Sequence, residues 1–467
     1  MSYRSKVAIV YLLGFFVDLI NMFIANVAYP AIGQAMRASV SQLAWVSNGY
    51  ILGLTLVIPL SAWLAQRIGG RRVFLLSLAL FMLATLGAGN ADSIGALIGW
   101  RTLQGMGGGL LIPIGQTLTY QLYRSHERAG LSAAIMLVGL LAPALSPALG
   151  GWLVDRLDWR WVFFANLPLA ALALALAALW LRAETSAAVR KPLDGKGLLS
   201  ASAALTLLLL GLTRLSEAGH QASGAALLAA GLLVLAAGLL VLAYYLRHSL
   251  RTPQPLLNLR LVADPLLRNA MAVYLCIPGL FIGVSLVAML YLQNQLGMPA
   301  AQVGGLMLPW ALASFLAITL TGKTFNRLGP RPLLIAGCLL QGAGMLTLAQ
   351  IDLAGQHALQ IAAFALMGFG GSLCSSTAQS SAFLQIPDAQ LADASALWNI
   401  NRQLSFCLGV ALLSLLLNLL LTGLPPAAAY RTCFILAGAS VFIPLLLCLR
   451  LANRAIVRQL NAQQDAL

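Results

Sequence analysis

Long apolar stretches dominate this chain and limit it to one broad class of fold. Hydrophobic residues make up 60% of the 467 residues, charged residues only 9%, and the mean hydropathy is +0.87. A water-soluble core cannot bury that much apolar surface, whereas a bilayer core about 30 Å thick accepts helices of roughly 20 apolar residues. The sequence predicts an all-α integral membrane protein. Its fourteen predicted transmembrane helices cover residues 7–29, 42–65, 73–90, 93–120, 129–154, 161–182, 197–214, 224–246, 269–292, 301–322, 331–351, 357–383, 393–421 and 430–450.

Basic residues lie between the apolar stretches, and their distribution predicts the orientation. The formal net charge is +15, but Lys and Arg do not gather in one segment, so nucleic acid is not an expected partner. Most of the 28 Lys and Arg residues fall on the side that holds both termini, which the positive-inside rule makes cytoplasmic. The exceptions are Arg37, Arg156, Arg160, Arg214 and Arg431 on the opposite side, and Arg101 and Arg402 inside predicted spans.

Cysteine and histidine placement argues against a disulfide framework, a metal site or an enzyme active site. The six cysteines lie in or beside apolar spans without short paired spacing, and the four histidines fall in loops or at span edges without ligand spacing. No phosphate-binding Gly-x-x-x-x-Gly-Lys-Ser/Thr loop occurs, which argues against an ATP-driven pump. We expect no enzyme activity and no cofactor. The N-terminal apolar segment lacks a cleavage pattern and is expected to remain as the first helix.

Asp18 is the one acidic residue deep in a predicted span. At about 1.5 Å of rise per residue it lies roughly 16 Å into the segment 7–29, near the centre of the hydrocarbon layer. The other acidic residues fall in loops, in tails or in the first turn of a span. An ionisable group in a membrane costs several kcal/mol, so its presence indicates a functional site. Asp18 is a candidate proton-coupling residue.

The two ends of the chain repeat each other. GMGGGLLIPIGQ (105–116) recurs as GFGGSLCSSTAQ (368–379), and the segment from Ala62 to Arg71 recurs at identical spacing as Gly322 to Arg331. Such repeats are typical of secondary transporters, which hold the substrate near the membrane midplane between the repeats. We therefore predict an N-terminal six-helix bundle (1–182), two inserted helices with their linkers (183–268), and a C-terminal six-helix bundle with a short tail (269–467).

Seven motifs in order resemble the major facilitator superfamily, specifically its fourteen-helix drug:proton antiporter branch, over nearly the whole chain. They are NVAYP (26–30), WLAQRIGGRR (63–72), RTLQGMGGG (101–109), APALSPALGGW (142–152), WRWVFFANLP (159–168), YLQ (291–293) and NRQL (401–404). The resemblance implies a secondary active transporter in a bacterial inner (plasma) membrane, working as a monomer. It implies proton-coupled efflux of small organic compounds by alternating access.

The resemblance also implies roles for individual residues. Arg101 is linked in the family to proton movement. Asp18 departs from the pattern, because the family's first-helix acid falls at Asn21, one turn away on the same face. The family's loop acids are replaced by Gln66 and Asn326, which favours a neutral hydrogen-bonded latch over a charged one. Candidate gate and hinge residues are Arg67, Gly69, Arg71, Arg327, Gly329 and Arg331 in the loops, and Pro143, Pro147, Gly150 and Gly151 in the helix 129–154.

Substrate identity stays open at this stage. Away from their ends, the predicted spans contain one acidic residue, Asp18, and two arginines, Arg101 and Arg402. An exporter of an anionic or neutral metabolite, such as a carboxylate siderophore, is therefore an alternative to general drug efflux. Na⁺ is an alternative to H⁺ as the coupling ion, and a receptor or sensor of transporter ancestry is a third reading. Candidate substrate-binding residues are Asn21, Asn26, Tyr50, Gln104, Gln116, Trp310, Gln379, Trp398, Asn399, Asn401 and Arg402.

Overall fold

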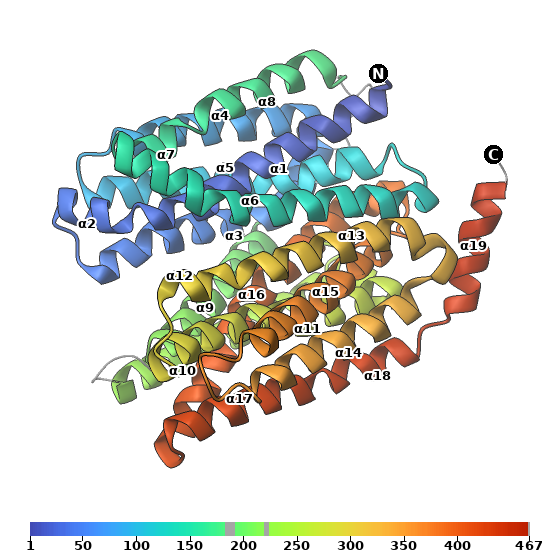
Figure 1. Cartoon of the computed structure of the whole chain (residues 1–467). Helices are drawn as coiled ribbons and strands as arrows, with labels where there is room; N and C mark the ends of the chain where they lie inside the picture. The colour runs from blue at the N-terminus through green and yellow to red at the C-terminus, as the bar shows by residue number, and fades with distance from the viewer. Residues whose placement is uncertain (183–191, 219–223, 466–467) are drawn as a thin grey trace.

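The computed structural model of the chain is all-helical, which confirms the predicted fold class. It describes residues 1–182, 192–218 and 224–465, and these ranges contain no β-strand. The first eight helices pack on one another and are called the N-terminal group; Figure 1 draws them in blue to green. They are α1 (Tyr3–Val27), α2 (Tyr29–Met36), α3 (Val40–Ile68), α4 (Gly70–Gly89), α5 (Ile94–Tyr120), α6 (Arg128–Arg156), α7 (Trp161–Phe164) and α8 (Leu167–Trp180).

A second set of helices, the C-terminal group, is drawn in yellow to red. It contains α11 (Pro265–Leu290), α12 (Ala300–Gly305), α13 (Met307–Leu328), α14 (Pro330–Leu348), α15 (His357–Ala382), α16 (Leu391–Gly423), α17 (Pro426–Ser440) and α18 (Phe442–Leu449). Between the groups come α9 (Gly195–Ala218) and α10 (Gly224–Arg251), and α19 (Asn453–Asp465) ends the described chain. The predicted domain boundaries stay predictions; residues 183–191, next to the first boundary, lie outside the described residues.

Thirteen helical segments of the described chain are long and apolar enough to cross a membrane, so the predicted count of fourteen is not confirmed. The difference is the predicted span 93–120. It forms α5, which has 27 residues but is not among the thirteen. Arg101, Gln104, Gln116 and several glycines lower its apolar character. α5 is largely buried by protein, so it does not need the hydropathy of a lipid-facing helix.

Some predicted spans are interrupted. The first is continued by α2 after a break at Ala28, the span 161–182 divides into α7 and α8, and the last divides into α17 and α18 at Val441. Proline falls in the first turn of α2 and of α8, where its missing N–H breaks no helical hydrogen bond. Residues 453–465, predicted only as part of a short tail, form α19.

Glycines bring α3 and α5 into backbone contact. A Cβ on Gly53 would lie 1.9 Å from the carbonyl oxygen of Thr102, and a Cβ on Gly105 would lie 2.0 Å from that of Tyr50. No side chain larger than hydrogen fits at either position. This close approach places Tyr50 of α3 beside α5, and it allows polar side chains of the two helices to meet.

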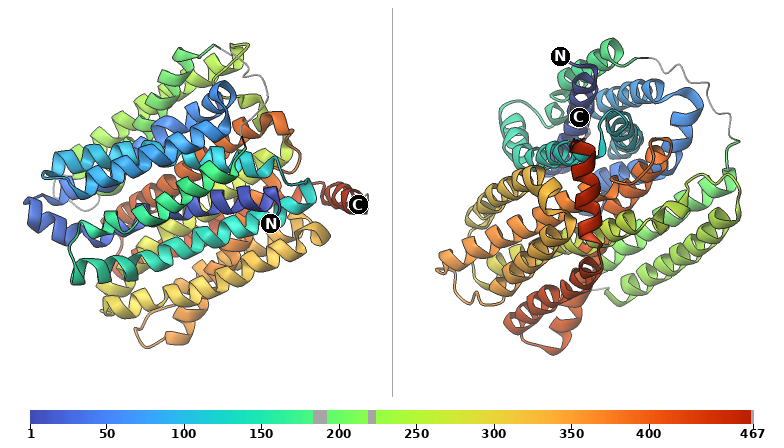
Figure 2. Two further views of the ribbon diagram at one scale, coloured as in Figure 1. Left: turned by 90° about the horizontal axis from the view of Figure 1, so that it is seen from above. Right: turned by 90° about the vertical axis from the view of Figure 1, so that its right-hand side faces the viewer.

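The inserted pair lies to one side of the two groups. α9 packs against α3 of the N-terminal group and α16 of the C-terminal group, whereas α10 packs mainly on α9 (Figure 2). Many apolar side chains of α10, including Leu232, Leu233, Leu239 and Leu240, are exposed, as expected of a lipid-facing helix.

Both termini lie at the same end of the helix bundle (Figure 1), which is called the termini end below. Helix α19 lies across this end and packs against α13 of the C-terminal group and the short helix η1 (Ser125–Glu127) of the N-terminal group (Figure 2). Its apolar residues Ile456 and Leu460 are buried there. α19 therefore spans the boundary between the two groups.

Candidate functional site

Asp18 lies in a buried polar cluster of the N-terminal group. Its side chain is 1% exposed, and its Oδ1 accepts a hydrogen bond from the hydroxyl of Tyr50, which is also buried. The same hydroxyl lies 3.4 Å from the backbone carbonyl oxygen of Asp18. The other carboxylate oxygen, Oδ2, is buried and has no hydrogen-bond partner in the described part of the chain. Asp18 thus presents one unpaired oxygen at which a proton or a cationic group can bind.

Arg101 of α5 lies beside this carboxylate and is completely buried. Its Nε donates to the carbonyl of Val46 (3.1 Å), and its Nη1 donates to Asn21 Oδ1 (2.6 Å) and to Gln104 Oε1 (2.7 Å). The guanidinium lies 4.4 Å from the centre of the Tyr50 ring. Neutral dipoles and an aromatic face therefore hold the guanidinium, and no ion pair to it occurs among the described residues.

The cluster extends to α4 and depends on a glycine of α5. Gln104 Nε2 donates to Thr85 Oγ1 at 2.6 Å, so helices α1, α3, α4 and α5 all contribute to it. A Cβ on Gly108 would lie 1.9 Å from Asp18 Oδ1 and 3.0 Å from the Tyr50 hydroxyl. Thr85 and Gly108 were not singled out from the sequence. The GMGGG run (105–109) is the feature of the sequence that points to Gly108.

Other predicted substrate residues lie where the two groups meet. Asn399 of α16 donates to Gln116 Oε1 of α5 at 3.0 Å, and both side chains are buried. One turn further along α16, the guanidinium of Arg402 lies 5.5 Å from the centre of the Phe15 ring in α1. These contacts place α16 directly against helices of the N-terminal group.

The remaining predicted substrate residues are more dispersed. Trp398 is buried against Tyr274, with ring centres 4.9 Å apart, and Trp310 is half-buried and stacked on Phe281 at 5.3 Å. Gln379 is buried, and its Nε2 has no partner among the described residues. Asn401 donates to a carbonyl of α11, whereas the side chain of Asn26 lies outside the described residues.

A second set of polar contacts joins the two groups at the termini end. Arg128 at the start of α6 donates to the carbonyl of Phe383 (2.5 Å) and to Asp388 Oδ1 (3.1 Å). Asn326 Nδ2 donates to the carbonyl of His126 at 2.7 Å. These hydrogen bonds, and that of Asn399 with Gln116, join the two groups on the termini side of Asp18. Nothing in the sequence distinguishes Arg128, because a basic residue at the start of a helix is also an ordinary topology signal.

The loops with repeated Arg and Gly residues form tight connections between helices. Gly69 (φ 88°) joins α3 to α4 and Gly329 (φ 75°) joins α13 to α14, and positive φ favours glycine at both. Arg71 donates to the carbonyl of Ala178 at 2.9 Å, and Arg67 lies 5.2 Å from the ring of Trp63. The backbone N–H of Arg331 donates to Asn453 of α19, and Arg327 is exposed.

The predicted hinge helix α6 is continuous from Arg128 to Arg156. Gly150 lies against α1, because its Cβ would be 3.0 Å from Ile24, whereas a Cβ on Gly151 would meet no atom within 4 Å. Pro143 is half-buried, and the side chain of Pro147 lies outside the described residues. The hinge role of these residues stays a prediction.

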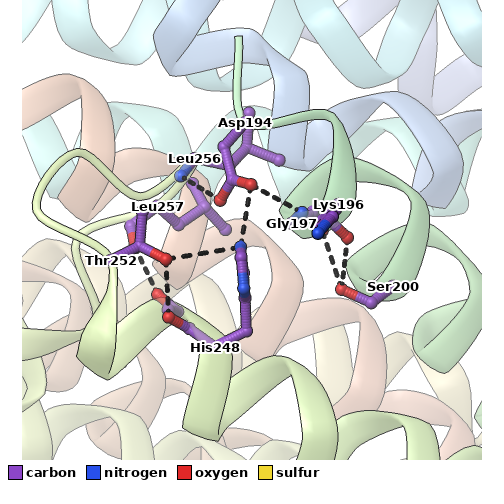
Figure 3. Close-up of polar contacts among 9 residues, drawn as sticks. Asp194, Lys196, Gly197, Ser200, His248, Thr252, Leu256 and Leu257 are labelled. Carbon is purple, nitrogen blue, oxygen red and sulfur yellow. Dashed lines mark hydrogen bonds and ion pairs between the residues drawn. The ribbon is translucent and has the colours of Figure 1, made fainter. Parts of the chain in front are cut away.

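A separate polar cluster lies where α9 begins and α10 ends (Figure 3). Asp194 Oδ1 contacts His248 Nε2 at 2.8 Å and accepts from the N–H of Gly197 at 2.8 Å, while Oδ2 accepts from the N–H of Leu256 at 3.3 Å. The cluster ties α9, α10 and the segment that leads to α11 together. No group of three or more metal-ligating side chains occurs in the described ranges.

Comparisons with known proteins agree with this architecture. The family model of the Major Facilitator Superfamily matches residues 11–410. The multidrug resistance protein B homolog of Mycobacterium tuberculosis is 32% identical over 404 residues, covering 85% of this chain and 73% of that protein. The putative multidrug resistance protein MdtD of Cronobacter sakazakii is 30% identical over 421 residues, covering 87% and 84%. The drug efflux pump JefA of Mycobacterium tuberculosis is 29% identical over 404 residues, covering 86% and 78%.

Solved structures show the same fold at low identity. A double-Trp variant of XylE has a TM-score of 0.67 at 15% identity and covers 99% of both chains. A bacterial homologue of the iron transporter ferroportin, in an outward-facing state, has a TM-score of 0.65 at 14% identity and covers 96% of this chain and 99% of that one. The resemblance predicted from the seven motifs is confirmed: the chain is an integral membrane transporter of the major facilitator superfamily.

Proposed function

We propose that this transporter is an exporter that exchanges a small organic compound for protons by alternating access. The observation that carries the proposal is Asp18, a buried carboxylate with one oxygen held by Tyr50 and the other unpaired. The relatives named for multidrug resistance and drug efflux support export as the direction.

Exchange requires that proton and substrate compete for one site. Asp18 is the single acid of the buried cluster, and Arg101 fixes the helices around it through bonds to Asn21, Gln104 and Val46. A proton on Asp18 and a basic or dipolar group of the substrate cannot both occupy the unpaired oxygen. Each ligand then favours a different state of the two helix groups, which is the requirement for coupled transport.

The hydrogen bonds between the two groups at the termini end support a defined place in this cycle. If both termini are cytoplasmic, as the positive-inside rule predicts, then the contacts of Arg128 with Phe383 and Asp388 seal the cytoplasmic side. A transporter closed there takes up protons from outside onto Asp18. Opening of the same contacts would return the protons to the cytoplasm of a bacterial cell, with the protein acting as a monomer in the inner membrane.

The test is proton-driven transport in proteoliposomes with the fluorescent dye ethidium as the probe. An imposed pH gradient should drive ethidium accumulation by the wild type, and ethidium binding to the purified protein in weak buffer should release protons. Asp18→Asn should abolish both signals. Asp352→Asn, which removes an exposed loop acid, serves as the matched control. Undiminished pH-driven transport by Asp18→Asn would refute the role of Asp18.

The alternatives from the sequence have their own signatures in this assay. Transport that is driven by a Na⁺ gradient in the absence of a pH gradient would identify Na⁺, rather than H⁺, as the coupling ion. A receptor of transporter ancestry would bind the dye but show no exchange of labelled against unlabelled dye. Proton uptake, rather than release, on substrate binding would indicate co-transport instead of exchange.

A further inference from the structure

We propose that Arg402 restricts the exchanged compound to at most one positive charge, so that the substrates are aromatic monocations and neutral bases. This inference rests on the proposed exchange at Asp18. Arg402 belongs to α16 of the C-terminal group, whereas Asp18 belongs to α1 of the N-terminal group. The two opposite charges therefore belong to different helix groups.

Geometry places Arg402 close to the proton site. Its guanidinium lies over Phe15, which precedes Asp18 by three residues and so lies about one helical turn away on the same face of α1. At 1.5 Å per residue, Arg402 lies about 16 Å from the start of α16 at Leu391, and Phe15 lies about 18 Å from the start of α1 at Tyr3. The two residues therefore lie at similar distances from the starts of their helices.

Arg402 faces the boundary without a counter-charge. In the chain as described, it has no ion pair and no hydrogen bond, in contrast to Arg101, which three polar groups hold. Asn399, one turn earlier on α16, bonds to Gln116 of the N-terminal group, which shows that this stripe of α16 is turned toward that group. A side chain that is long, half-buried and unpaired can approach whatever ligand lies at Asp18.

The charges at this level decide which ligands fit. Asp18 can neutralise one proton or one monovalent cation, so exchanging the two leaves the buried charge unchanged. A second positive charge on the ligand finds no acid and meets Arg402, and such repulsion in a poorly solvated site lowers binding by roughly tenfold to a hundredfold. Tyr11 and Phe15, whose stacked ring centres lie 5.9 Å apart, are buried in the two turns of α1 before Asp18 and would become an aromatic surface for the ligand when the two groups separate.

A matched pair of dyes tests the proposal. Ethidium and propidium share one aromatic ring system, but propidium carries a second quaternary ammonium. Binding of each dye to the purified full-length protein, measured by fluorescence polarisation, does not depend on proton coupling. We expect the wild type to bind ethidium at least tenfold more tightly than propidium, and Arg402→Gln to reduce that ratio to about one. Arg402→Lys, which keeps the charge, should preserve the ratio, as should Arg247→Gln in the outlying helix α10.

The outcomes separate this inference from the proposed function. Equal binding of both dyes by the wild type, binding of neither, or an unchanged ratio in both Arg402→Gln and Arg402→Met would overturn the charge limit. Tighter binding of an anionic aromatic dye such as fluorescein, lost in Arg402→Gln, would overturn it too and assign Arg402 to anion recognition. If pH-driven transport failed while the preference for ethidium over propidium remained, only the proposed proton exchange would be refuted, and the charge limit would stand.

Discussion

The two helix groups share a repeated sequence but differ in which polar and charged side chains they bury. In the N-terminal group, α5 carries Arg101, whose guanidinium is held by Asn21, Gln104 and a carbonyl. At the equivalent position of α15 the C-terminal group has Phe364, which is fully buried. The charged network is therefore present in only one copy of the repeat.

The C-terminal group carries neutral polar atoms in place of that network. Several buried hydroxyl and amide atoms of α14, α15 and α16 have no partner among the described residues: those of Gln341, Ser376, Thr377, Gln379, Ser395 and Ser405. A buried group without a partner costs about 1–3 kcal/mol, so ligands or ordered water are the expected partners during transport. The comparison suggests that one copy handles the proton, while the other provides adaptable polar contacts.

Among the substitutions that test this comparison, the largest expected effect comes from filling the space beside Asp18. In Gly108→Ala the new methyl group would lie 1.9 Å from Asp18 Oδ1, so the carboxylate and the Tyr50 hydroxyl must separate. Misplacement of a reacting group by about 1 Å can cost roughly 100-fold in rate, and we expect a loss of that order in pH-driven dye transport. The measurement is the initial rate in proteoliposomes at equal protein content.

The repeat supplies the control for this substitution. Gly371 is the equivalent residue of α15, and the three atoms nearest to a Cβ there all belong to the side chain of Gln341, the first at 2.8 Å. A flexible side chain can move away, so Gly371→Ala should reduce transport less than about threefold. Equal losses in both variants would show that the two copies of the repeat are functionally equivalent, contrary to the comparison.

The next effect concerns the arginine that distinguishes the two copies. Arg101→Gln removes a charged donor from three acceptors, and each charge-assisted hydrogen bond contributes about 1.5–3 kcal/mol. We expect roughly a 30-fold loss of transport and a lower temperature of thermal unfolding. Phe364→Leu, at the equivalent position, should lower the unfolding temperature but leave the pH dependence of transport unchanged. A pH profile shifted by Phe364→Leu and unshifted by Arg101→Gln would reverse the assignment.

Sequence alone predicts the helices and the isolated charges, because a bilayer makes both conspicuous. Asp18 and Arg101 stand out as charges inside apolar stretches, and each is indeed buried in the described chain. Helical periodicity does not reveal which helix lies opposite a given face. The contact of Asp18 with Tyr50, the position of Arg402 over Phe15 and the clash that a side chain at Gly108 would cause therefore appear only in three dimensions.

The same limit explains the missed contacts at the termini end. Arg128 and Asp388 are separated by most of the chain, and each reads as an ordinary loop charge. Helix α19 has few apolar residues, so it looks like a solvated tail until its packing on η1 and α13 is seen. Asn326, from which a neutral latch is predicted, donates a hydrogen bond to the carbonyl of His126, and the latch itself stays a prediction.

A moderate effect is expected where the two groups meet. Arg128 is 5% exposed, and Arg128→Gln would weaken its bonds to the Phe383 carbonyl and to Asp388. A loss of about 1.4 kcal/mol shifts the equilibrium between closed and open termini ends roughly tenfold. Labelling of a cysteine introduced at Leu384, which is 3% exposed beside this contact, in a background without reactive cysteines, should accelerate accordingly. Asp388→Asn should act more weakly, because Asp388 is 68% exposed and the pair is screened by solvent.

The smallest effect is expected outside both groups, at Asp194 and His248. Partial burial acts to raise the pKa of Asp194, but hydrogen bonds from the N–H of Gly197 and from His248 outweigh it, and the pKa lies below its ordinary value. A lowered pKa stabilises the folded state above the ordinary Asp value of about 3.9, and that contribution is lost as pH falls through the lower folded value. Asp194→Asn should therefore lower the unfolding temperature by a few degrees at pH 7 and by less near pH 3. Dye transport should stay within about twofold of wild type, because α10 lies away from the boundary of the two groups; a larger loss would mean that the inserted helices take part in the exchange.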